Sequence, residues 1–317
     1  MKYKNLFIAL FILTLFFAFS AIQKPTHRNK AEICIVNGFP FHYEMFGYII
    51  EYCVHRRTPL DIYTETKNNY GWLSFYKNNV CSLITFYPIS EYNPNNAYRR
   101  IILTTDDDPV VKDEWKFDKI IAIDHNEDLR KPQIKYHIST RWFESRPDTD
   151  YILPAFRLIT LEDKQRFSRP AVVCLGGNTE LSIAKFKKLF SNFETTEFWF
   201  VDRKAEPEKF REYPNIHCVK QMDTTEMLDL CKKSHWMFIS DEKKTHMKKS
   251  MSAAIMLGFS CLCKILMPAE MNVNYEYKSV QEYTDTIMLD AVDFSRIDTE
   301  LIEIQAHKFR VFDKYLL

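Results

Sequence analysis

Glycine is scarce in this chain of 317 residues, which contains only 6. Each glycine is therefore expected to meet a backbone requirement, such as a turn or the close approach of two segments. No repeat of fixed period is visible, which argues against a solenoid. The formal net charge is +1, so no excess of positive charge indicates nucleic acid as a partner. Hydrophobic residues make up 46% of the chain, enough to build the cores of two ordinary domains.

The chain also lacks a paired-cysteine motif. None of its 8 cysteines belongs to a Cys-x-x-Cys pair, and Cys261 and Cys263 alternate along an expected strand, which is not the spacing of a metal clip. Most of the cysteines fall in expected strands or helices, where a free thiol behaves as a small apolar side chain. No Asn-x-Ser/Thr sequon occurs either. We therefore favour buried thiols over a disulfide framework.

The N-terminus carries a long uncharged run. Two lysines precede the segment from Leu6 to Ile22, which is about long enough to cross a bilayer when slightly tilted. Because it exceeds the roughly 7–15 residues of a usual signal-peptide core, we predict a single-pass signal-anchor and short stem over residues 1–30. The Ala-Phe-Ser sequence ending at Ser20 has the form of a cleavage site, and cleavage there would give a secreted protein instead. The positive charges that flank the apolar run are balanced, so they do not decide on which side of the membrane the rest of the chain lies. One of the two orientations would place it in the lumen of the endoplasmic reticulum or Golgi.

From residue 31 onward, short apolar runs alternate with loops and amphipathic segments. Unbroken apolar runs are typical of parallel strands buried on both faces. We therefore predict an α/β fold with two Rossmann-like doubly wound parallel-sheet domains after the membrane helix, at residues 31–160 and 161–298, and a C-terminal helix at 299–317. The expected strands lie at 33–36, 60–64, 81–86, 100–104, 119–123, 136–139 and 151–153, and then at 171–175, 198–201, 217–219, 236–239 and 261–266.

Residues 234–267 carry the clearest functional pattern. They read as an apolar strand, a charged loop, a small-residue helix and a second apolar strand. The helix is expected to open at Lys248 or Ser250 and to end at Gly258. A helix N-terminus favours an anion because its unpaired N–H groups and its dipole both attract negative charge. We therefore predict that the diphosphate of a nucleotide lies against Lys248, Ser250 and Ser252.

Two glycines follow the first strand of the second half. Gly176 and Gly177 would let a diphosphate approach the backbone at the start of the next helix. The alternative is a tight turn that needs positive φ. Lysines in the loop before the 250s helix would neutralise a leaving diphosphate, or they form a solvated charged loop; these are Lys243, Lys244, Lys248 and Lys249.

Candidate bases follow the strands of the first half. An acceptor hydroxyl must lose a proton to a group with a pKa near the working pH, and histidine supplies one without adjustment. His42 and His125 each follow an expected strand, as does Asp107 in an acidic turn. That turn has two other interpretations: aspartates that bond their own backbone, or carboxylates that hold a divalent ion. A divalent metal is possible but not favoured, and no cofactor is required.

Three segments resemble GT-B glycosyltransferases, in which two Rossmann-like domains face each other and the C-terminal one holds the nucleotide-sugar. Residues 37–44 resemble the glycine-bearing first loop of that class, which places Gly38 and Glu44 on the acceptor side. Residues 215–219 and 227–231 resemble the strand and helix before the donor site, and residues 250–258 resemble the donor helix of glycosyltransferase family 4. The resemblance implies transfer of a sugar from a nucleotide-sugar to a glycan, protein or lipid acceptor. Together with the apolar N-terminal run, it predicts a transferase bound to a membrane through its N-terminal helix.

The donor motif departs from that family. Many retaining members carry paired glutamates across this loop and helix, and the matching positions here are Thr245 and Ala253. Either Glu242 serves from the loop, or the mechanism differs, or the site is inactive. A catalytically inactive GT-B-like protein that binds a glycan or a partner is therefore a competing interpretation. A metal-dependent transferase of the single-domain fold, using the acidic turn, is a third.

Overall fold

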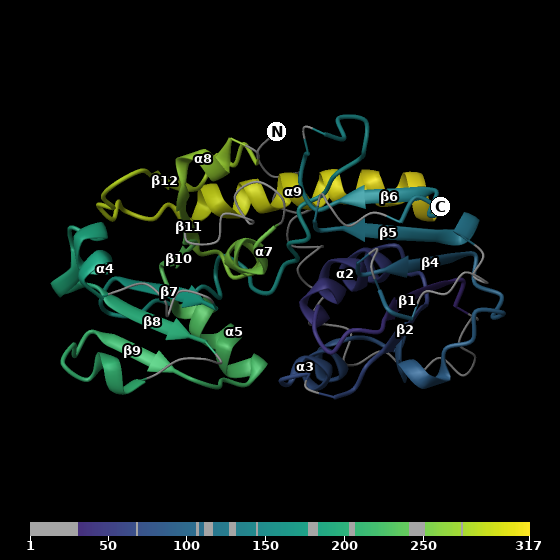
Figure 1. Ribbon diagram of the computed structural model, residues 1–317, viewed down its shortest axis with the longest axis horizontal. Coiled ribbons are helices and arrows are strands. Elements are labelled where there is room, and N and C mark those ends of the chain that lie inside the picture. Colours follow the sequence, from purple (N-terminus) through teal and green to yellow (C-terminus); the bar gives the residue numbers. More distant parts are fainter. Residues whose placement is uncertain are drawn as a thin grey trace.

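The computed structural model describes residues 31–67, 69–105, 108–110, 117–126, 131–143, 145–176, 183–202, 207–240, 251–273 and 275–317. Figure 1 shows two α/β domains side by side. Each is built on a six-stranded parallel sheet, which confirms the expected pair of Rossmann-like domains. The expected membrane helix of residues 1–30 lies outside the described residues. Within the described ranges, no helix has the length and apolar character needed to span a bilayer.

The N-terminal sheet has the strand order β3-β2-β1-β4-β5-β6. Its apolar runs form strands that are mostly buried, as parallel strands covered on both faces must be. The order reverses between β1 and β4, and such a switch point opens a crevice beyond the carboxyl ends of the strands. The strands are β1 (Ile33–Asn37), β2 (Leu60–Thr64), β3 (Ile84–Pro88), β4 (Arg100–Leu103), β5 (Ile120–Asp124) and β6 (Tyr136–Ser139).

The C-terminal sheet repeats this topology in the order β12-β11-β10-β7-β8-β9. Its switch point lies between β7 and β10, which pair in parallel. The same rule therefore places a second crevice beyond these two strands. The strands are β7 (Ala171–Leu175), β8 (Glu197–Val201), β9 (Ile216–Val219), β10 (Trp236–Phe238), β11 (Lys264–Pro268) and β12 (Gln281–Tyr283).

Helices connect the strands and cover the sheets. The long C-terminal helix α9 crosses from the C-terminal domain back onto the N-terminal domain, so the chain's end contacts both (Figure 1). The helices are α2 (Gly47–His55), α3 (Trp72–Asn79), α4 (Ile183–Leu189), α5 (Thr224–Lys233), α7 (Ala253–Ser260), α8 (Ala269–Asn272) and α9 (Phe294–Leu316). Short 3-10 turns lie at η2 (Tyr43–Phe46), η3 (Ile89–Glu91), η4 (Phe117–Lys119), η5 (Phe193–Thr195) and η6 (Pro207–Phe210).

Gly258 lies inside α7 rather than after it. The helix continues to Ser260 and its C-cap is Cys261, so the expectation that Gly258 ends the helix is wrong. A Cβ on Gly258 would lie 3.0 Å from Cγ1 of Ile265 in β11 and 3.3 Å from Cβ of Met237 in β10. The glycine therefore allows α7 to pack closely on the sheet, which is a spatial need and not a conformational one.

Three expected strands differ from the structure, and β12 was not expected. The strand expected at 81–86 begins at Ile84. The strand expected at 261–266 begins at Lys264, because Cys261 still belongs to the end of α7. The strand expected at 151–153 is reduced to a single bridge between Tyr151 and Ser139. This segment leaves the sheet at once because it has to carry the chain into the second domain.

Two helix starts are set by aspartate caps. The N-cap of α5 is Asp223, whose carboxylate accepts a hydrogen bond from the Thr225 N–H, and Glu226 completes a capping box. The C-terminal helix begins at Phe294 rather than at Thr299, because the Asp293 carboxylate caps it. An aspartate thus fixes both starts, and at α9 the hydrophobic pattern alone misplaced the boundary.

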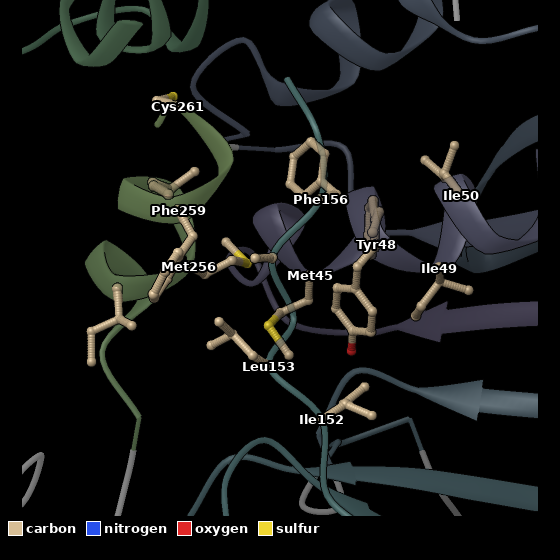
Figure 2. Close-up of a cluster of buried hydrophobic side chains, with 14 of the residues drawn as sticks. Met45, Tyr48, Ile49, Ile50, Ile152, Leu153, Phe156, Met256, Phe259 and Cys261 are labelled. Atoms are coloured by element: carbon tan, nitrogen blue, oxygen red, sulfur yellow. The ribbon is translucent and has the colours of Figure 1, made fainter. Parts of the chain in front are cut away.

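One hydrophobic core joins the two domains. It contains side chains of α2, of the linker after β6 and of α7, and Figure 2 shows Leu153 and Phe156 of the linker lying between α2 and α7. The linker is also bonded to the end of α7, because the Phe156 N–H donates to Ser260 Oγ at 3.0 Å and the Leu158 N–H donates to the Ser260 carbonyl at 3.2 Å. The linker is therefore packed between the domains and is not a free tether.

Gly47 marks the tightest point of this shared core. A Cβ at that position would lie 2.3 Å from Cε1 of Phe156, which is far inside van der Waals contact. We expect Gly47→Ala to lower the free energy of unfolding by about 1–3 kcal/mol, as overpacking of a core does. Denaturant unfolding measures it. Phe156→Leu should make room, so the double variant should lose less stability than the sum of the single losses; strict additivity would contradict the steric explanation.

Candidate functional site

A buried polar network lies at the switch point of the N-terminal sheet, where β1 and β4 end. Asn37, the last residue of β1, accepts a hydrogen bond from Thr104 Oγ1 at 3.0 Å and donates to the Phe41 carbonyl at 2.9 Å. Both Asn37 and Thr104 are fully buried. The network therefore sets the path of the loop after β1, which carries Gly38 and His42.

Asp108 is the second anchor of this loop. Its carboxylate accepts from the Gly38 N–H at 2.7 Å and from the Val110 N–H at 2.9 Å. A Cβ on Gly38 would lie 2.6 Å from Asp108 Oδ1, so only glycine allows this approach. Asp108 thus bonds backbone groups, as the turn interpretation of the acidic segment expects. The candidate base Asp107 lies outside the described residues.

His42 and His125 come together at the carboxyl edge of the N-terminal sheet. Their ring centroids are 4.7 Å apart. His42 adopts φ 64°, the left-handed conformation, at the start of η2, and its Nδ1 lies 3.6 Å from Oε1 of Glu44. Both histidines and Glu44 are half-buried. The structure therefore gathers three sequence-predicted residues at one point.

Glu44 supplies negative charge to this group. Burial raises the pKa of its carboxyl, but the close approach of His42 and the positive charge that His42 and His125 carry when protonated outweigh that effect and leave the pKa below its usual value. Glu44 is consequently a carboxylate at neutral pH. A carboxylate beside an imidazole stabilises the positive charge that the ring acquires when it takes a proton.

The start of α7 lies against the same group. The Met251 N–H donates to the His125 carbonyl at 3.2 Å, and Ser252 is the N-cap residue of α7. In Figure 1, α7 lies on the side of the C-terminal domain that faces the N-terminal domain. The expected start at Lys248 or Ser250 is thus displaced to Ala253, and Ser252 is the predicted donor residue that the structure brings to the histidines.

Gly176 ends the first strand of the C-terminal sheet in a left-handed conformation, with φ 61°. This is the positive φ that the turn interpretation requires. A Cβ there would meet no described atom within 4 Å, so the turn has open space on that side. The other donor candidates, Gly177, Glu242, Lys248 and Ser250, lie outside the described residues, as do Lys243, Lys244 and Lys249.

Two arginines of the segment after β6 have different partners. Arg146 forms an ion pair of 3.0 Å with Asp124, which also contacts Nδ1 of His137 at 2.9 Å. Arg141 is buried, and its guanidinium lies 5.4 Å from the ring centroid of Tyr275 in the C-terminal domain. Tyr275 is an interdomain contact residue that the sequence did not indicate, because a tyrosine after a short helix has no distinguishing pattern.

The domains also touch at the far end of the interface. The Thr224 hydroxyl donates to the Tyr70 carbonyl at 2.6 Å, and the Thr224 N–H donates to the same oxygen at 2.9 Å. This contact joins the start of α5 to the start of α3. In the described ranges, no group of three or more His, Cys, Asp or Glu side chains is arranged to hold a metal ion.

No protein-family model matches the chain, and no curated protein matches it in sequence. Solved structures do match. The chain superposes on AviGT4, a glycosyltransferase involved in avilamycin A biosynthesis, with a TM-score of 0.63 at 9% identity, covering 89% of this chain and 96% of that one. The chain therefore has the GT-B glycosyltransferase fold.

Weaker similarities are to E. coli ADP-heptose lipopolysaccharide heptosyltransferase II and to Anabaena HepE in complex with UDP and glucose. The first has a TM-score of 0.45 at 9% identity and covers 88% of this chain and 99% of that one. The second has a TM-score of 0.45 at 8% identity and covers 90% and 95%.

Proposed function

We propose that this protein is a glycosyltransferase that moves a sugar from a nucleotide-sugar to a hydroxyl of a glycan, protein or lipid acceptor. The observation that carries the proposal is the contact between the start of α7 and His125, whose ring packs at a tilt against that of His42. Sugar transfer with inversion needs a base for the acceptor and a stabilised leaving diphosphate on opposite sides of one carbon atom. A histidine pair beside a helix N-terminus has the elements of both.

In this proposal His42 removes the acceptor proton, and Glu44 stabilises the charge that the ring gains. The diphosphate lies at the N-terminus of α7, near Ser252, where unpaired N–H groups and the helix dipole attract it. Gly38, His125 and Asp107 face the acceptor, and Gly176, Gly177, Glu242, Lys248 and Ser250 complete the donor side. Residues 1–30 anchor the enzyme in a membrane.

The second candidate is an inactive GT-B-like protein that binds a glycan or a partner. One feature favours it: Ala253 is the exposed first residue of α7, at a position where many retaining members of the resembling family carry a glutamate. No carboxylate is therefore present there to hold a donor hydroxyl. The two candidates differ in whether a nucleotide binds.

A thermal-unfolding screen of the purified full-length chain against nucleoside diphosphates and their sugars separates them. A transferase should be stabilised by one nucleotide class, by about 2.7 kcal/mol at a hundredfold excess over Kd, and not by the matching nucleoside. Ser252→Asp places a residue that is favoured at an N-cap, so α7 should stay folded, but its charge should repel the diphosphate, whereas Ser252→Ala should not repel it. If no nucleotide raises the melting temperature, the inactive candidate is the better one.

A further inference from the structure

A separate cavity of about 250 Å³ lies in the N-terminal domain, between β2, β3 and the segment that follows them. It is on the face of the sheet opposite α2. Ile62 packs into the core that includes α2, whereas its neighbour Tyr63 packs into a second core with Cys34 and Leu103, since alternate residues of a strand point to opposite faces. The cavity is lined by Asp61, Tyr63, Tyr87, Glu91, Asn96, Ala97 and Tyr98.

Tyrosine rings make up much of the wall. Tyr63 stacks on Tyr87 with centroids 5.0 Å apart, and Tyr92 packs edge-on against Tyr63 at 5.2 Å. The lining also includes Tyr98, whose ring is 6.1 Å from that of Tyr63. Three rings from β2, β3 and the following loop therefore border one small space.

The hydroxyl groups of two of these tyrosines are engaged with each other and with a carboxylate. The Tyr98 hydroxyl donates to Asp61 Oδ2 at 2.7 Å, and the Tyr63 and Tyr98 hydroxyl oxygens are 2.8 Å apart. This chain of hydrogen bonds fixes the rings in place. These two hydroxyls are therefore engaged within the wall of the cavity.

The charged side chains of the lining are both acidic. Asp61 is 8% exposed and lies in β2, whereas Glu91 is exposed at the end of η3. Neither lysine nor arginine is among the lining residues. Lys119 bonds to the backbone carbonyl of Tyr98 at 3.2 Å, outside this lining. The cavity thus has one carboxylate buried in its wall and a second one exposed.

We propose that this cavity binds a small organic ammonium ion. The faces of aromatic rings attract cations through their quadrupoles, most strongly where water is excluded, and the two carboxylates add charge of the required sign. A neutral saccharide would instead require free hydrogen-bonding groups, and the hydroxyls of Tyr63 and Tyr98 are already engaged. The volume is below the roughly 300–1,000 Å³ of drug-sized pockets, which suits a small cation.

Calorimetric titration of the full-length chain with choline tests the proposal. The matched control is 3,3-dimethyl-1-butanol, in which a carbon replaces the charged nitrogen. The protein is kept in a nonionic detergent, whose headgroup carries no cation that could compete with choline. Choline should bind saturably and its neutral isostere should not. Equal binding of both, or binding of neither, overturns the proposal, as does binding of methyl glucoside in place of choline.

Variants then assign the binding to this cavity. Asp61→Asn keeps an acceptor for Tyr98 and should weaken choline binding by about tenfold or more, because it removes a buried charge. Glu91→Gln should weaken it by about two- to fivefold, and Glu162→Gln, at an exposed position in the linker, should leave it unchanged. If Asp61→Asn does not fold, Tyr87→Leu replaces it, with an expected loss of about three- to tenfold. Unchanged affinity in Glu91→Gln and in the folded lining variant overturns the assignment.

Discussion

Replacing Lys308 by methionine is expected to lower the free energy of unfolding by about 3–5 kcal/mol, because it breaks a buried ion pair and leaves one charge behind. Lys308 lies in α9 and its side chain is fully buried. Its ammonium is 2.7 Å from Oε2 of Glu51 in α2 and donates to the Ala155 carbonyl in the linker at 2.5 Å. The variant therefore disturbs the point where the C-terminal helix, the linker and the N-terminal domain meet.

The pair is held by more than two atoms. The Arg157 N–H donates to Glu51 Oε1 at 2.9 Å, and Gln305 also donates to that oxygen. Burial lowers the pKa of Lys308, while the charge and hydrogen bond of Glu51 raise it, and the net pKa lies below its usual value. In Lys308→Met the Glu51 carboxylate keeps its neutral donors but loses the cation, which is why the expected loss is large.

Lys314→Met is the matched control on the same helix. Lys314 pairs with Asp150 at 2.5 Å, but its side chain is 63% exposed, so the expected loss is at most about 1 kcal/mol. Adding Glu51→Gln to Lys308→Met should recover part of the stability, because the unpaired charge is then removed. Urea unfolding of the four proteins measures these differences. Equal losses of unfolding free energy in Lys308→Met and Lys314→Met would show that the buried Glu51–Lys308 pair contributes no more to stability than an exposed pair.

Much of the sheet architecture could be predicted from the sequence, because buried parallel strands leave unbroken apolar runs. The run LDIYT predicts β2 with its observed bounds, Leu60–Thr64, and AVVCL predicts β7. Boundaries set by tertiary packing could not be predicted. Gly258 has the sequence position of a helix stop, yet its role comes from Ile265, which reaches it only in the folded sheet. The Glu51–Lys308 pair likewise joins residues far apart in the chain.

The sequence predicted at which edge of the N-terminal sheet the candidate site lies, but not how its side chains are arranged. His42 and His125 each follow a strand, and the carboxyl ends of parallel strands share one edge, so their proximity follows from topology. The contact between the two rings depends on the left-handed turn at His42. No sequence pattern around His42 predicts that turn. The contact of Arg141 with Tyr275 depends on how the two domains meet, and local patterns carry no information about that.

His42→Asn is expected to reduce the turnover of the proposed transferase by about 10²–10⁴-fold, the usual contribution of a general base. Asparagine is the appropriate replacement because it tolerates the left-handed conformation of His42 but cannot accept a proton at neutral pH. Alanine would add backbone strain at φ 64° to the loss of the ring. The readout is release of nucleoside diphosphate from the donor that the thermal screen identifies, with water or an added sugar as acceptor.

Binding and catalysis should separate in this variant. The diphosphate lies at the start of α7 in the proposed site, so the nucleotide-induced rise in melting temperature should be the same in His42→Asn and in the parent protein. Glu44→Gln should reduce turnover less, because Glu44 acts only through the charge on His42. His125→Asn serves as the comparison, since its ring lies 4.7 Å from His42. A large loss in His125→Asn with full turnover in His42→Asn would assign the base to His125, and full turnover in both would remove the histidine pair from the mechanism.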